Sequence, residues 1–65
     1  MEHAAHIALA DHIRAKRIKK KDFARLVGVR SEQLSRWLGG NVKPERSARI
    51  LISIVTDGVI KPEDW

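Results

Sequence analysis

The chain has no cysteine and no tyrosine, and its aromatic residues are limited to one phenylalanine and two tryptophans. Without cysteine there is neither a disulfide nor a thiolate metal site, so 65 residues must rely on a tightly packed core or on one shared with a partner. This length predicts a single domain over 1–65. The early apolar stretch, 4–10, is interrupted by His6, followed by Asp11 and preceded by no basic segment. We therefore expect no signal peptide and no membrane span, consistent with a cytoplasmic protein.

Acidic residues are scarce in the middle of the chain. Residues 14–49 contain twelve lysines and arginines but only three acidic residues, a balance of +9, whereas the two ends together carry −4, giving +5 for the whole chain. Nucleic acid is the commonest partner of such a basic surface, although the charge alone is explained first by a merely solvated basic face. The distribution favours a polyanionic partner and needs a second observation to support it.

That second observation is the stretch 20–39, KKDFARLVGVRSEQLSRWLG, which predicts two short amphipathic helices joined by a tight turn. The first is expected over about 20–27 and the second over about 31–38. Gly28 suits the turn because it adopts a positive φ without steric cost, and one residue of Gly39-Gly40 is expected to cap the second helix in the same way. The inner faces consist of Phe23, Ala24 and Val27 on the first helix and Leu34, Trp37 and Leu38 on the second.

The remaining segments also favour helices. A first helix is expected over about 2–16, with a stripe of Ala5, Leu9 and Ile13. A fourth is expected from Pro44 to about 56, ending at Asp57-Gly58, followed by an extended segment with one turn after Pro62. The predicted fold class is all-α, a compact bundle of four to five helices. The alternative is α+β with a C-terminal β-hairpin, because 50–55 is rich in β-branched residues and Asp-Gly is a hairpin signal.

The fourth predicted helix carries more apolar residues than one face requires. Ile50 and Ile54 lie on a different side from Ala48, Leu51 and Val55. So small a monomer cannot cover a helix that is apolar nearly all round, which predicts a homodimer contact. The expected interface residues are Ile50, Ile54, Val59, Ile60 and Trp65. The alternative is that the C-terminal tail folds back and covers this surplus within one chain.

The segment FARLVGVRSEQLSRW resembles the helix-turn-helix of phage Cro and repressor proteins and their prophage relatives, and VKPERSARILISIVTDGVIKPEDW continues the likeness to the end of the chain. The resemblance implies a five-helix domain that binds operator DNA as a two-fold dimer. Two positions depart from the family pattern: Arg30 stands where a Ser or Thr cap is common, and Lys20 where Gln is common. The second departure is expected to strengthen backbone binding.

The resemblance also implies which residues touch DNA, since the start of the second motif helix enters the major groove. The expected base-reading residues are Arg30, Ser31, Glu32, Ser35 and Arg36. Arg36 is the best reader because a guanidinium bonds O6 and N7 of guanine together; alternatively it pairs with Glu32 one turn away. The expected phosphate contacts are Lys19, Lys20, Lys21, Gly40, Asn41 and Lys43. The three lysines stand at a helix N-terminus, where positive charge is unfavourable unless a phosphate is bound there.

Other polar residues form no pattern typical of a catalytic site. His3, His6 and His12 are expected on a solvent-facing helix surface, and no nucleophile–base pair or phosphate-binding glycine loop occurs. We expect no enzyme activity, no cofactor, no metal and no small-molecule ligand. The leading hypothesis is a sequence-specific transcriptional regulator of double-stranded DNA, a Cro-type repressor acting on a pseudo-palindromic operator as a dimer. The alternatives are a helix-turn-helix antitoxin or protein-interaction subunit, and an activator that uses the same domain.

Overall fold

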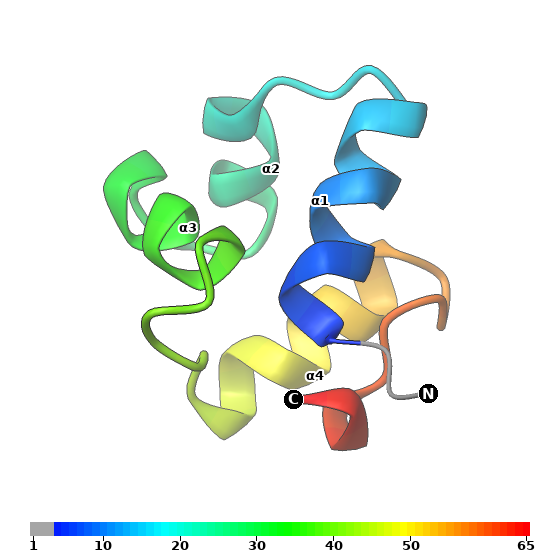
Figure 1. Ribbon diagram of the computed structural model, residues 1–65. Coiled ribbons are helices and arrows are strands. Elements are labelled where there is room, and N and C mark those ends of the chain that lie inside the picture. The colour runs from blue at the N-terminus through cyan, green and yellow to red at the C-terminus, as the bar shows by residue number, and fades with distance from the viewer. Residues whose placement is uncertain (1–3) are drawn as a thin grey trace.

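The computed structural model describes residues 4–65, and within them it contains four α-helices, one short 3₁₀ helix and no strand. The all-α prediction is confirmed and the β-hairpin alternative is wrong. Residues 50–55 remain helical because Ala48 and Ile52 face the core one turn apart, and Asp57-Gly58 ends that helix instead of joining two strands. The elements are α1 (Ala5–Ala15), α2 (Lys20–Leu26), α3 (Ser31–Leu38), α4 (Arg46–Val55) and η1 (Pro62–Asp64) (Figure 1).

One hydrophobic cluster joins the four α-helices and Ile60 of the C-terminal tail. α2 and α3 pack on each other, α1 packs on α3, and η1 lies against α4. In Figure 1, α2 and α3 lie together on one side of α1, and α4 crosses beneath them. The large apolar side chains Leu9, Phe23, Leu34 and Ile52, one from each α-helix, are fully buried, as is Ile60 of the tail. None of the helices in residues 4–65 is long and apolar enough to cross a membrane.

Each α-helix of the described chain ends in the same hydrogen-bonded turn. After α2, the amide of Val29 donates to Ala24 O (2.9 Å) and that of Gly28 to Arg25 O (3.1 Å), the pair of bonds that defines a Schellman motif. Gly28 has φ +75°, as predicted for the turn of the motif. After α3 the corresponding residue is Gly40, with φ +78°, and not Gly39. The equivalent residues after α1 and α4 are Arg17 and Asp57, two non-glycine residues with φ near +57°.

The main difference from the predicted boundaries is the start of α4. The helix begins at Arg46, two residues after the expected Pro44, and Glu45 is its extended N-cap. Pro44 is buried in the preceding loop, and its carbonyl accepts a hydrogen bond from Arg49 Nε (2.9 Å). The fixed φ of proline thus shapes the loop instead of the first helical turn. The predicted start of the first helix lies outside the described residues.

The C-terminal tail returns to the core through Thr56, a buried polar residue. Thr56 Oγ1 donates to Ile52 O (2.8 Å) and accepts from the Ile60 amide (3.2 Å), which turns the chain back beneath α4. Ile60 is 1% exposed, so the prediction that it contributes to a dimer interface is wrong: it is a core residue. Trp65 is half-buried against the same core. The tail therefore covers part of the apolar surplus within its own chain, as the alternative proposed.

Candidate nucleic-acid interface

The outer face of α3 gathers most of the side chains predicted to read bases. Leu34 and Trp37 are buried and fix the rotation of the helix about its axis. The opposite side is exposed over about two turns, while Arg30 stands at the extended N-cap position. The exposed residues of this face are Ser31, Glu32, Ser35 and Arg36. Gln33, at the edge, is half-buried.

Arg36 makes no ion pair with any residue of the described part of the chain. Among residues 4–65 the only ion pair is Asp11–Arg14, at 3.5 Å between exposed side chains of α1. The pairing of Arg36 with Glu32, which the sequence left open, is therefore absent. An exposed guanidinium without an internal partner keeps all its donors available for an external acceptor.

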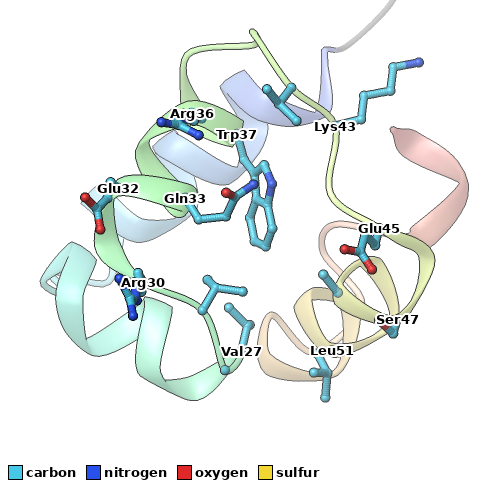
Figure 2. A pocket seen from close by; sticks show the side chains of 14 residues that line it. Val27, Arg30, Glu32, Gln33, Arg36, Trp37, Lys43, Glu45, Ser47 and Leu51 are labelled. Atoms are coloured by element: carbon cyan, nitrogen blue, oxygen red, sulfur yellow. The ribbon is translucent and has the colours of Figure 1, made fainter.

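An open groove of roughly 860 Å³ runs along one side of α3 (Figure 2). One wall carries Arg30, Glu32 and Arg36, and the other, from the α3–α4 loop and the start of α4, carries Lys43 and Glu45. Figure 2 shows the indole ring of Trp37 projecting into the space between the two walls. The apolar floor consists of Val27, Val29, Trp37, Val42, Ala48 and Leu51. The groove therefore has charged residues on its walls and apolar residues on its floor.

The lysines and the asparagine predicted to bind phosphate lie at two ends of α3. Lys19 is the N-cap of α2, and Lys20 and Lys21 are its first two residues, all exposed. Asn41 and Lys43 are exposed in the loop that follows α3. Figure 1 shows the start of α2 at the top of the molecule and the α3–α4 loop at the bottom, with α3 between them. The arrangement provides a cationic segment on each side of the α3 outer face.

Gly40 closes the turn after α3 and lies against His6 of α1. Its amide donates to Trp37 O (3.0 Å) inside the turn. Its Cα faces the imidazole of His6, since a Cβ built at Gly40 would stand 2.8 Å from His6 Nε2. The backbone is thus covered by α1 on that side, while Gly40 as a whole is exposed, so its approach to a phosphate stays a prediction.

Three residues of the site were missed by sequence reasoning. Arg25 lines a shallow groove beside Lys21, Arg30 and Ser31, so it extends the basic surface along α2. Its spacing of four residues from Lys21 was the signal that could have revealed it. Val42 and Leu51 line the larger groove, but no local pattern separates Leu51 from the core residues beside it.

Comparison of the chain with protein-family models, curated proteins and solved structures finds no match in any of the three. Of the three histidines expected on a solvent-facing surface, His3 lies outside the described residues, and His6 and His12 are half-buried on α1. Within residues 4–65 there is no group of three or more His, Cys, Asp or Glu side chains able to hold a metal ion. The assignment of function therefore depends on the geometry of α3 and its surroundings.

Proposed function

We propose that the protein is a sequence-specific DNA-binding regulator that inserts α3 into the major groove. The observation that carries the proposal is the outer face of α3, where Ser31, Glu32, Ser35 and Arg36 are exposed on a helix whose inner face is held by Leu34 and Trp37. Arg36 is assigned to bidentate bonding with a guanine, and Glu32 to acceptance from a cytosine amino group. Ser31, Ser35 and Arg30 complete the reading set. α2 and the glycine turn support α3 as in a helix-turn-helix.

The charge distribution supports the proposed orientation on DNA. Lys19, Lys20 and Lys21 are assigned to the phosphates on one side of the groove, and Asn41 and Lys43 to those on the other. These contacts position the protein and set its salt dependence without reading sequence. Lys20 replaces a neutral residue of the family pattern, so nonspecific affinity is expected to be higher than that pattern implies.

A homodimer accounts for the exposed apolar residues of α4. Ile50, Ile54 and Val59 remain exposed, with Leu51 beside them, although the tail covers other apolar groups. The protomer measures 30 × 24 × 21 Å along its principal axes, so two side by side can present their α3 helices to successive major grooves, about 34 Å apart. We infer a pseudo-palindromic operator and, from the resemblance to Cro and repressor proteins, repression by occlusion of the promoter in the cytoplasm.

In vitro selection of bound duplexes from a random pool, followed by mass measurement of the complex, tests the proposal. The expected result is an enriched sequence with two-fold symmetry and a stoichiometry of two chains per duplex. A pool that stays unenriched would overturn sequence-specific binding. Enrichment of an asymmetric site by one chain would retain DNA reading and overturn the dimer.

A second candidate is a protein-interaction subunit, such as a helix-turn-helix antitoxin, in which α4 holds a different protein. The specific observation in its favour is that Ile50, Leu51 and Ile54 of α4 are all exposed, Ile54 to 69%. This role would be favoured if the chain co-purifies in a fixed ratio with the product of a neighbouring gene and is a monomer when purified by itself. An activator would bind the same DNA and differ only in raising transcription in a reporter assay.

A further inference from the structure

The two glycine turns of the domain have the same backbone conformation but different surroundings. At Gly28, φ +75°, a Cβ would meet nothing within 4 Å. At Gly40, φ +78°, a Cβ would stand 2.8 Å from Nε2, 3.0 Å from Cε1 and 3.1 Å from Cδ2 of His6. The imidazole edge thus occupies the space that a side chain at residue 40 would need. A side chain at residue 40 would therefore require the His6 ring to move, in addition to the strain of a positive φ.

His6 comes from the first turn of α1, far along the chain from the turn that it contacts. It lies in a cleft of roughly 380 Å³ between the start of α1, the end of α3 and the C-terminal η1. The loop side of the cleft contains Gly40, Val42 and Lys43, and the η1 side contains Asp64 and Trp65. The ring of His6 is therefore the contact through which α1 supports the beginning of the α3–α4 loop.

We propose that His6 is a positioning residue for DNA binding: its ring holds Gly40, and through it sets Asn41 and Lys43 against the phosphate backbone. The inference rests on the proposed function, because Asn41 and Lys43 matter only if the loop meets DNA. It gives α1 a part in binding although α1 contributes no side chain to the reading face. The amides of Gly40 and Asn41 donate to Trp37 O (3.0 Å) and Arg36 O (3.3 Å), and His6 adds a contact from a different helix to this turn. The residues that follow in the loop, Val42 and Lys43, are exposed.

Removal of the ring takes away the contact from α1, while the turn keeps its hydrogen bonds and α3 remains packed through Leu34 and Trp37. The loop then samples positions from which Lys43 misses its phosphate. Fewer counterions are released on binding, so the dependence of affinity on salt becomes shallower. Base discrimination by Arg36 is expected to stay unchanged. This combination separates a positioning role from a general loss of folded protein, which lowers apparent affinity without changing the salt slope.

The functional test measures binding to a fluorescein-labelled mixed-sequence duplex by anisotropy at several salt concentrations. His6→Ala is expected to weaken binding a few-fold and to lower the salt slope by about one. His6→Phe, which keeps a flat ring against Gly40, is expected to restore both. His12→Ala is the matched control, a half-buried histidine of the same helix that does not line the cleft, and should match the wild type.

The contact itself is tested by thermal melting, without DNA. Gly28→Ala is expected to lower the melting temperature by about 4–8 °C from backbone strain alone. Gly40→Ala should lower it further because of the clash with His6. In the double variant His6→Ala with Gly40→Ala, the new methyl group fills the space left by the ring. The loss should therefore be smaller than the sum of the two single losses.

The outcomes separate this inference from the proposed function. If the wild type binds the duplex and His6→Ala has the same salt slope, the positioning role is overturned and DNA binding stands. If the wild type does not bind at all, the proposed function falls and the positioning role falls with it. Additive melting losses in the double variant would overturn the contact between His6 and Gly40.

Discussion

α3 and α4 are built alike on the inside and differ on the outside. Each buries two residues in the shared core, Leu34 and Trp37 from α3 and Ala48 and Ile52 from α4. The exposed side of α3 carries charged and hydroxyl groups. The exposed side of α4 carries Ile50, Leu51 and Ile54. The inner faces make one fold, and the outer faces suit different partners: α3 suits a hydrated polar surface and α4 an apolar one.

The physical cost of the two outer faces explains the difference. Charged side chains such as Arg36 lose nothing by remaining in water, whereas each exposed isoleucine forgoes about 25 cal/mol per Å² of apolar area that burial would provide. A chain of 65 residues has little core to spare, yet it leaves three large apolar residues of α4 outside. We infer that α4 is covered in the functional assembly.

The largest expected effect comes from charging the α4 face. Ile50→Asp combined with Ile54→Asp should convert a dimer to a monomer, because burial of two isoleucines contributes at least about 3 kcal/mol. Sedimentation equilibrium measures the mass of each variant. Ile7→Asp is the matched control, since Ile7 is 52% exposed but belongs to α1. A wild type that is monomeric both free and on DNA would contradict the assigned role of α4.

On the α3 face, Arg36→Ala should cost about 1–3 kcal/mol at one base position and relax specificity there. Competition assays with single-base operator variants measure the loss. Arg14→Ala, which removes an exposed arginine of α1 paired with Asp11, serves as control and should leave discrimination intact. A uniform loss across all sequences would reassign Arg36 to phosphate binding.

The connection from α4 to the tail depends on the hydroxyl of Thr56. Thr56→Val should lower the free energy of unfolding by about 1–3 kcal/mol, since the buried Ile60 amide loses its acceptor. Thr56→Ser keeps the hydroxyl and should retain most of the stability. Urea denaturation measures both. Unchanged stability of Thr56→Val together with a loss in Thr56→Ser would show that the methyl group, and not the hydrogen bond, stabilises the turn.

The flanking lysines should have smaller and less selective effects. Lys43→Gln should lower the salt slope by about one and weaken binding to every sequence by a similar factor. Binding to specific and random duplexes across a salt series measures both quantities. Lys61→Gln, an exposed lysine of the tail, is the control. If both substitutions lower the salt slope equally, Lys43 does not contact DNA phosphates more closely than Lys61 does.

The smallest effect concerns how the two helices end. α3 ends with Gly40 in the left-handed region, but α4 ends with Asp57 at φ +57°. Asp57→Gly should therefore stabilise the protein by about 1 kcal/mol or less, measured by thermal melting. Asp57→Asn controls for the lost charge. A destabilised glycine variant would mean that the carboxylate makes a compensating local interaction.

Local sequence patterns predicted much of the segment from α2 to α3. α3 occupies 31–38 as expected, and Gly28 forms the turn before it, because helix periodicity and glycine conformation are properties of a few neighbouring residues. The start of α4 was less predictable, since Pro44 fits either a first helical turn or a loop. The choice depended on burial of its ring and on Arg49.

The apolar residues of the C-terminal third were the least predictable. The sequence contains more apolar residues there than one helix face can hold, but it does not indicate which of them are buried. Ile60 is buried because Thr56 binds its amide and turns the tail beneath α4, whereas Ile54 and Val59 are left outside. Composition and spacing are the same for a covered and an uncovered isoleucine.

The amino-acid sequence by itself specifies where the helices form, which face of each is apolar, and that the basic charge surrounds the two-helix motif. These follow from local conformational preferences and from side-chain chemistry. Tertiary packing alone assigns Ile60 to the core, leaves Arg36 without an ion-pair partner among residues 4–65 and brings His6 of α1 onto Gly40. The physical reason is that burial and contact depend on segments far apart in the chain, which meet only when the common core forms.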